Sequence, residues 1–285
     1  MDKQSILMAV PTFLFSAILI AFVIWNVYLS FTNYSIFQKI PQFAGLYSYY
    51  KTLTPPFFNS LIHSFELSVA LVVFGNLLGL LFACLIYFVR LERLRTIYLS
   101  LMIYPLAISM AANGLIWLWL FNPTIGLNFL LSSLHVPVYP WLTSPSSAFP
   151  SMIVVSTWAY TGFALLFYLA AFLGVDKSII ESARLDGSGP FRIVTRILIP
   201  NSVNAFIISS IILFLFSFRI FTLPYMLSGG PYNSLLQTLV VYMYVQFSTE
   251  FFARSAVVGV IITIIALAVV IPYALYGMKR WIRHE

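Results

Sequence analysis

Charged residues are scarce in this chain, since Asp, Glu, Lys and Arg together make up 8% of its 285 residues. Hydrophobic residues make up 61% and aromatic residues 18%, a composition that excludes a soluble globular domain of this length. The single cysteine, Cys84, excludes an intrachain disulfide bond. The three histidines, His63, His135 and His284, lie far apart in the sequence, so no cluster has the spacing of a metal site.

Two kinds of catalytic motif are also missing. No Gly-x-x-x-x-Gly-Lys-Ser/Thr segment occurs, which excludes ATP binding by a P-loop on this chain. No serine, histidine and aspartate fall where the topology predicted below would bring them together as a triad. We therefore expect this chain to have no enzymatic activity and to bind no cofactor of its own.

Long hydrophobic runs are abundant. A helix needs about 20 apolar residues to cross the roughly 30 Å hydrocarbon core of a bilayer. Six runs are long enough, and they occupy residues 6–31, 64–89, 96–120, 150–174, 203–227 and 255–278. The first is too long for the hydrophobic region of a signal peptide, so we expect it to be retained. The sequence predicts an all-α integral membrane protein with six transmembrane helices, and residues 1–285 are expected to form one membrane domain.

The distribution of Lys and Arg predicts the orientation in the membrane. Most of them fall on the side that carries both termini: Lys3, Arg90, Arg93, Arg95, Lys177, Arg184, Arg192, Arg196, Lys279, Arg280 and Arg283. The other side has Lys39, Lys51 and Arg254, and Arg219 falls within a span. The positive-inside rule therefore predicts a multi-pass protein of the cell membrane with both termini in the cytoplasm. This asymmetry explains the net charge of +7 without a nucleic-acid partner.

Charge is concentrated between the fourth and fifth predicted spans. Seven residues between 176 and 196 are charged: Asp176, Lys177, Glu181, Arg184, Asp186, Arg192 and Arg196. The last two are four residues apart, which places them on one face of a helix. A membrane protein with this much charge in one cytoplasmic loop, about residues 175–200, is expected to present that loop to a partner in water.

The same loop contains signals for two short helices with a fixed bend. Ser178 and Glu181 have the spacing of a capping box, which begins a helix. Gly187 can adopt the left-handed conformation that ends it, and Pro190 suits the first turn of a second helix. Pro200 is expected where the chain turns back toward the membrane. The loop is therefore predicted to be rigid enough to transmit force.

This pattern resembles the EAA loop of ABC-importer permeases. Glu181, Ala183, Asp186, Gly187 and Pro200 match the family spacing. The chain departs from the usual pattern at Ser182, Ser188 and Ile199, which are mild changes. The resemblance implies that the first helix of the loop, with Glu181, contacts an ATPase subunit, and that Gly187 forms the turn.

The resemblance covers most of residues 40–278 and is closest to permeases of the maltose and glycerol-phosphate type. Further matching segments lie within residues 43–61, 95–128 and 228–242. The resemblance implies the permease fold of a type I ABC importer for a carbohydrate. The implied partners are a second permease subunit, expected to be a different chain, two ATPase subunits that hold ATP and Mg, and an extracytoplasmic binding protein. Membrane lipid would surround the spans.

A sugar cavity would combine aromatic faces with a few hydroxyl or amide groups. The fourth span carries Ser156, Tyr160 and Phe163 at i, i+4 and i+7, on one helix face. Corresponding candidates on the third and fifth spans are Met110, Asn113, Phe216, Ser217 and Arg219. Two alternatives stay open: these side chains simply pack helices together, or the partner permease holds the sugar. Arg219 either faces the cavity or extends to the outer interface.

Two other functions are compatible with a six-span protein. An ion-coupled secondary transporter predicts ionisable residues paired near the membrane midplane, and only Arg219 is available there. A subunit without a transport role predicts no polar stripe on the fourth and fifth spans. The sequence favours the permease subunit over both.

Overall fold

A computed structural model describes residues 3–282 of the chain, with the side chains of residues 10–273 and 275. Within this part all regular structure is helical, which confirms the all-α prediction. Of the residues used above, Arg283 and His284 lie outside the described part, as do the side chains of Lys3, Lys279 and Arg280. Short helices between the longer ones are α2 (Tyr47–Thr52), α6 (Leu127–Ser133), α8 (Lys177–Leu185), α9 (Pro190–Ile193), α10 (Ile199–Asn201), α12 (Thr222–Leu227) and α13 (Leu239–Ser248).

Four of the predicted spans are single long helices. They are α1 (Lys3–Ser30), α3 (Pro55–Tyr87), α7 (Pro145–Leu173) and α14 (Phe252–Ile282). The third predicted span is broken into α4 (Glu92–Ala107) and α5 (Met110–Leu120), which are bent by 94°. A second bent pair, at 67°, joins Pro190–Asn201 to α11 (Val203–Phe218). The described helices therefore give four possible spans, or up to six if each bent pair counts as one.

The helices differ from the predicted spans at three places. Helix α3 begins at Pro55 and not near residue 64, because proline fits the first turn of a helix, where no N–H is needed. For the same reason α7 begins at Pro145 and not near residue 150. The predicted fifth span, 203–227, is interrupted at Arg219–Phe221, between α11 and α12. Because the average hydropathy is high on both sides of this break, a hydropathy average could not reveal the break.

The break between α4 and α5 has a local cause. Ile108 and Ser109 both have extended backbone, and the Ser109 hydroxyl accepts a hydrogen bond from the N–H of Ala112. A serine in this role begins a new helix. The sequence 96–120 therefore contains a helix end and a helix start that an apolar count does not register.

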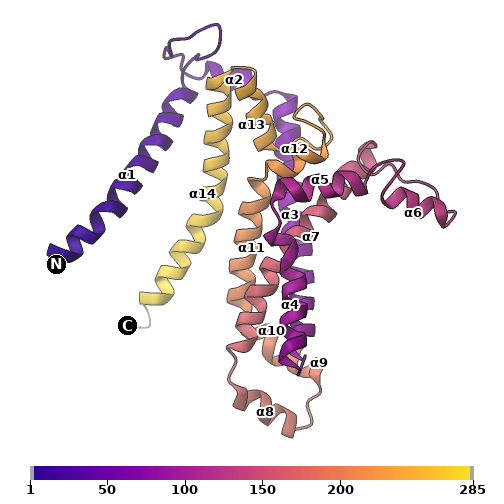
Figure 1. The fold of residues 1–285 in the computed structure, drawn as a ribbon. Helices are drawn as coiled ribbons and strands as arrows, with labels where there is room; N and C mark the ends of the chain where they lie inside the picture. Colours follow the sequence, from indigo (N-terminus) through magenta and orange to yellow (C-terminus); the bar gives the residue numbers. More distant parts are fainter. Residues whose placement is uncertain (1–2, 283–285) are drawn as a thin grey trace. The chain divides into compact units, whose positions relative to one another are not determined.

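The described chain divides into two compact units. The first contains the two ends of the chain, up to Asn59 and from Leu239. In it α14 packs against α1, α2 and α13 (Figure 1). The loop after α1 is held to the start of α14 by two backbone hydrogen bonds, from Ile36 N–H to the Glu250 carbonyl and from Ala253 N–H to the Tyr34 carbonyl, both 3.0 Å.

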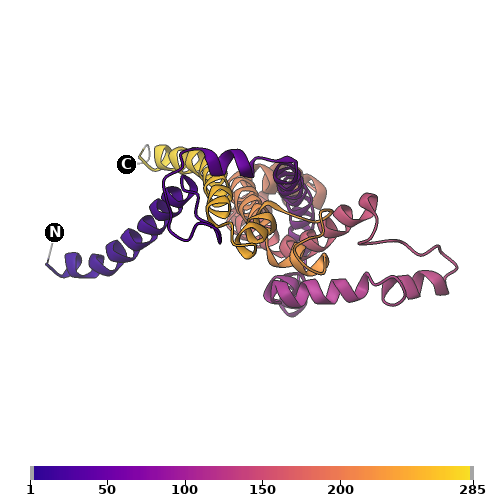
Figure 2. The same ribbon diagram turned by 90° about the horizontal axis from the view of Figure 1, so that it is seen from above.

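The second unit, Ser60–Thr238, contains the segments in which the sequence predicted function. Helix α7 is its centre and packs against α4, α11 and α12. Helix α8 lies at one end of this unit and α12 at the other (Figure 1). Viewed from above, the magenta segment with α5 and α6 extends to one side (Figure 2).

Close helix contacts in the second unit depend on glycine. A Cβ atom built on Gly79 of α3 would lie 2.6 Å from the Cβ of Ala164 in α7. One built on Gly162 of α7 would lie 2.6 Å from the carbonyl oxygen of Met102 in α4. Small residues at helix interfaces let backbones approach in this way inside membranes. These glycines set the spacing of α3, α4 and α7.

Asn76 links three helices by hydrogen bonds. Its Oδ1 accepts from the hydroxyl of Tyr168 in α7 at 2.9 Å and from that of Ser209 in α11 at 2.5 Å. Its Nδ2 donates to Ser210 Oγ at 3.2 Å and to the Val72 carbonyl at 2.7 Å. The amide oxygen and the amide nitrogen of Asn76 therefore make two hydrogen bonds each, and together these bonds join α3, α7 and α11.

Candidate functional site

The charged loop begins with a helix cap. Asp176 is the N-cap of α8, and its carboxylate accepts a hydrogen bond from the Ser178 N–H at 2.9 Å. The predicted capping box from Ser178 was therefore wrong: the helix begins two residues earlier, with Ser178 in its first turn. The hydrogen bond from the Ser178 backbone lowers the pKa of the Asp176 carboxyl below its usual value, because it stabilises the ionised form.

The turn after α8 has the predicted form. Gly187 has a φ of +79°, in the left-handed region that glycine adopts without strain. Its N–H donates to the Arg184 carbonyl at 3.0 Å, and the Ser188 N–H donates to the Ala183 carbonyl at 2.9 Å. These two bonds are those of a Schellman motif. Pro190 is the first residue of α9, so the bend between the two helices is fixed at both sides.

The loop has a buried side and an exposed side. Ile180 and Ile193 are buried and belong to the hydrophobic core of the second unit. Leu185 and Phe191, by contrast, are 89% and 81% exposed. Glu181 and Asp186 are also exposed, and Ala183 is half-buried. The loop is therefore packed against the hydrophobic core through Ile180 and Ile193, and it exposes two large apolar side chains.

The segment that leads back to α11 is not a regular α-helix. Residues Val194–Leu198 form a π-helical turn, in which the Ile199 N–H reaches the Val194 carbonyl. Pro200 follows in α10, and the chain bends by 67° before α11. The Asn201 amide donates to the Ile197 carbonyl at 2.7 Å and satisfies one carbonyl near the bend. The turn expected at Pro200 is therefore present, preceded by a π-turn that was not expected.

A cavity of about 570 Å³ lies in the same unit, between the start of α5, the middle of α7 and the end of α11. Five predicted residues line it: Met110, Tyr160, Phe163, Phe216 and Arg219. The remaining lining residues are Ile212, Leu215, Ile220, Phe221 and Thr222. The three spans that were expected to contribute therefore meet at one cavity.

Three rings form the aromatic wall of this cavity. The Phe216 ring centroid lies 5.5 Å from that of Tyr160 and 5.3 Å from that of Phe163. The second pair meets edge to face, an arrangement that aromatic pairs favour. Two helices, α7 and α11, thus present a continuous aromatic surface with one phenol group.

Arg219 provides the cavity's only positive charge among the residues that line it. The sequence placed Arg219 within a continuous span, whereas in the structure it is the C-cap of α11, directly before the break. A cation at this position interacts favourably with the negative end of the helix dipole. Its side chain is exposed. The helix break therefore brings a guanidinium to the cavity at a low electrostatic cost.

The other three predicted residues do not line the cavity. Ser217 is buried, and its hydroxyl donates to the Leu213 carbonyl at 2.9 Å within its own helix. Asn113 is also buried, and its amide donates to the Pro105 carbonyl at 3.1 Å. Ser156 is buried, and its hydroxyl has no hydrogen-bond partner among the described residues. Helical spacing predicts which residues share a helix face, but it could not show that Ser156, Asn113 and Ser217 are buried by the packing of neighbouring helices.

Sequence reasoning missed the glycines beside Asn76. Gly75 and Gly79 flank it with GxxxG spacing in an apolar helix, which is a recognised signal for close helix packing. A Cβ on Gly75 would lie 3.0 Å from a methyl group of Leu213 in α11. The motif therefore positions the two helices, α7 and α11, that form the aromatic wall.

Comparison with known proteins agrees with this arrangement. The sequence pattern of the family described as "Binding-protein-dependent transport system inner membrane component" matches residues 75–284. The chain is 54% identical over 284 residues to the glucose import system permease protein GlcT of Saccharolobus solfataricus, a match that covers 99% of each chain. It is 27% identical over 267 residues to the sn-glycerol-3-phosphate transport system permease protein UgpA of Pectobacterium atrosepticum, covering 89% of this chain and 88% of the relative.

A solved structure shows the same fold. It is the crystal structure of a bacterial ABC transporter involved in the import of the acidic polysaccharide alginate, and one of its chains matches with a TM-score of 0.76. The match covers 98% of this chain and 99% of that chain at 21% identity. With a family match over most of its length and a close full-length relative, the chain is a multi-pass membrane protein of the binding-protein-dependent transport family, the permease subunits of ABC importers.

Proposed function

We propose that this chain forms part of the translocation path for a sugar, with a monosaccharide such as D-glucose as the first candidate. The observation that carries the proposal is the cavity of about 570 Å³ with its wall of Tyr160, Phe163 and Phe216. Aromatic faces stack on the C–H faces of a sugar ring, while the Tyr160 hydroxyl and the Arg219 guanidinium can hydrogen-bond its hydroxyl groups. The name of the 54% identical relative supports glucose as the first substrate to test.

We further propose that the loop of α8 and α9 couples this chain to ATP hydrolysis on separate ATPase subunits. The two exposed apolar side chains, Leu185 and Phe191, suit a protein partner, and Glu181 and Asp186 are exposed beside them. The bend at Gly187 would transmit movement of the ATPase through Ile180 and Ile193 to the core. ATP and Mg would be held by the ATPase subunits.

The proposed assembly has a second, different permease subunit, two ATPase subunits and an extracytoplasmic sugar-binding protein. Both termini and the α8–α9 loop would lie in the cytoplasm. In an alternating-access cycle, closure of the ATPases would move the loop and open the cavity outward to receive sugar from the binding protein. Hydrolysis would then restore the inward-facing state.

Uptake of labelled D-glucose by the reconstituted complex tests the substrate. Phe216→Ala removes one ring of the aromatic wall, and we expect the apparent KM for glucose to rise about fivefold, since one lost aromatic contact of about 1 kcal/mol corresponds to that factor. Phe206→Ala is the matched control, because Phe206 is exposed on the same helix and does not line the cavity. An unchanged KM in the Phe216 variant would place the sugar elsewhere.

Gly187→Val tests the coupling. Valine is strained at a φ of +79°, so the bend should distort and sugar-stimulated ATPase activity should fall severalfold, with membrane insertion unchanged. Gly189→Ala is the control, because its φ of −71° suits any residue and nothing lies within 4 Å of an added Cβ. The alternative, an ion-coupled transporter, predicts that uptake stops when proton and sodium gradients collapse and continues without ATP. The proposal predicts the reverse.

A further inference from the structure

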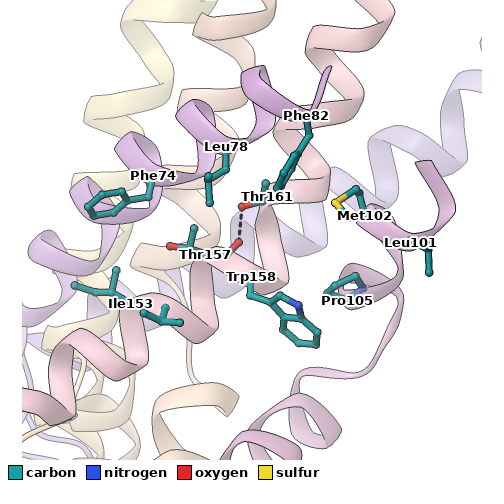
Figure 3. Close-up of a pocket in the computed structure, with 11 residues that line it drawn as sticks. Phe74, Leu78, Phe82, Leu101, Met102, Pro105, Ile153, Thr157, Trp158 and Thr161 are labelled. Carbon is teal, nitrogen blue, oxygen red and sulfur yellow. Dashed lines mark hydrogen bonds between the residues drawn. The ribbon is translucent and has the colours of Figure 1, made fainter. Parts of the chain in front are cut away.

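A second hollow in the Ser60–Thr238 unit has a different chemistry. It has a volume of about 470 Å³ and lies between α3, α4 and α7 (Figure 3). Phe74, Leu78 and Phe82 line it from α3, while Met102 and Pro105 line it from α4. We call it the α3–α4 groove. Its walls are apolar except for two threonines of α7, one of which donates its hydroxyl proton to a backbone carbonyl.

The groove is open along its side. Three of its lining residues, one from each helix, are about half exposed: Phe74 at 49%, Leu101 at 59% and Val154 at 55%. The neighbouring exposed residues of α3, Leu77, Leu81 and Leu85, are also apolar. In a protein that crosses a membrane, a surface of this kind faces hydrocarbon.

Two charged residues share the groove's face of α4, at the start of the helix. Counting back from Pro105 and Met102, the same face passes Tyr98 and reaches Arg95 and then the exposed Glu92, at intervals of three and four residues. Arg95 lies about 10 Å before Met102 along the helix. The Arg95 Nε is buried and has no hydrogen-bond partner among the described residues. Arg95 does not line the groove itself but lies farther along the same helix face, close to the turn between α3 and α4, and its Nε is an unsatisfied donor.

We propose that the α3–α4 groove binds an anionic phospholipid, with its phosphate on Arg95 and one acyl chain along the groove. The spacing suits this ligand, because an acyl chain extends inward from the headgroup toward the bilayer centre. Arg90 lies in the exposed turn between α3 and α4 and adds positive charge at the same membrane surface. Basic pockets between transmembrane helices bind anionic headgroups by this chemistry.

A phospholipid fits these observations better than a helix of the second permease subunit. A partner helix could fill the apolar part of the groove, but an acceptor for Arg95 would require an acidic or other polar group brought to the same place. Acidic groups within membranes are costly and rare, whereas lipid phosphates are abundant at the depth of a helix end. This lipid site is independent of the proposed sugar cavity, which shares no lining residue with the groove and lies between α5, another face of α7, and α11.

The chain offers a matched pair of arginines for the headgroup test. Arg95→Gln and Arg93→Gln remove the same charge from the same turn of α4, but residues two apart point about 160° away from each other. The complete permease complex is delipidated in detergent, titrated with phosphatidylglycerol or phosphatidylcholine, and examined by native mass spectrometry. We expect Arg95→Gln to weaken binding of one phosphatidylglycerol about fivefold and Arg93→Gln to leave it unchanged. Equal effects of both variants would show a general surface charge effect and overturn the site.

A second pair tests the acyl chain. Val154→Trp should fill the open side of the groove and displace the same lipid, while Leu166→Trp, exposed elsewhere on α7, should not. Inorganic phosphate should not compete at millimolar concentration, because it lacks the chain. A photocrosslinker at position 154 is expected to label lipid. If it labels the second permease subunit instead, and Val154→Trp leaves lipid binding intact, the groove is a subunit interface and the proposal is wrong. Loss of sugar transport in any variant does not bear on this outcome.

Discussion

Replacing Asn76 by leucine should loosen the junction of α3, α7 and α11. Leucine has a similar volume but cannot accept from Tyr168 and Ser209 or donate to Ser210, so three hydrogen bonds between helices are lost. Such bonds in membranes contribute about 0.6 kcal/mol on average and about 1.7 at most. We therefore expect the free energy of unfolding to fall by about 2 kcal/mol. Both hydroxyls keep a partner in this variant, because Ser209 still bonds to the Phe206 carbonyl at 3.1 Å and the Tyr168 hydroxyl is also hydrogen-bonded to Ser209.

A double-mutant cycle separates the hub from its partners. Tyr168→Phe alone should cost about 0.6 kcal/mol, because Asn76 keeps its contact with Ser209. In the Asn76→Leu background the same change should cost less, since the hydrogen bond between Tyr168 and Asn76 is already absent and only the contact with Ser209 remains to be lost. Unfolding is followed by circular dichroism in a titration with sodium dodecyl sulfate. Leu77→Ala, at the next and exposed position, controls for effects on α3 itself.

Two outcomes would refute this reasoning. If the effects of Asn76→Leu and Tyr168→Phe simply add, the two side chains are not energetically coupled, and the hydrogen bond between them contributes nothing to stability. If Asn76→Leu stabilises the protein, apolar packing at this position outweighs the polar junction, as replacing buried polar groups sometimes does.

Three further results are expected. Gly79→Val should lower the free energy of unfolding by about 1–3 kcal/mol, because a Cβ there would lie 2.6 Å from a side-chain carbon of α7; thermal unfolding beside Gly189→Ala, which should change little, checks this. The pKa of Asp176 is lowered in the folded chain, so the stabilisation of α8 by this cap is fully present above the usual carboxyl pKa of 3.8 and is lost as pH falls through the lower pKa of the folded chain. Amide exchange at Ser178, corrected for intrinsic rates, should show this loss at low pH in the native chain. The Asp176→Asn variant should not show it. Leu185→Ser should leave stability unchanged, since this side chain is 89% exposed, yet weaken copurification of the ATPase; normal copurification would count against its role in docking.

Sequence predicted the long helices well because apolar runs have a direct physical cause in the thickness of the bilayer. It did not predict the breaks at Ser109 and Arg219, since each lies between two apolar helices and changes no average. The cap of α8 shows another limit. Asp176 and Ser178 are both good N-cap residues two positions apart, and only the backbone geometry decides between them.

The candidate cavity was predicted in part for a related reason. Tyr160 and Phe216 are large and aromatic, and each lines the cavity on its own helix. Ser217 was predicted with them because it is polar and adjacent, but a serine can satisfy its hydroxyl on its own helix backbone and turn away from any ligand. Small polar side chains in apolar helices therefore locate a site less reliably than aromatic ones.

The π-helical turn at Val194–Leu198 means that the number of residues between α9 and α11 determines how α11 is rotated relative to the residues before the turn. Its i to i+5 hydrogen bond encloses one residue more than an α-helical turn does. Relative to an unbroken α-helix with the same number of residues, α11 is therefore reached with about 100° less rotation and about 1.5 Å less advance. In the coupling proposed above, the direction in which movement of the α8–α9 loop reaches α11 would depend on that one residue. Deleting a single residue here would leave Leu185 and Phe191 in place and, under the proposed coupling, would change the direction in which movement of the loop reaches α11.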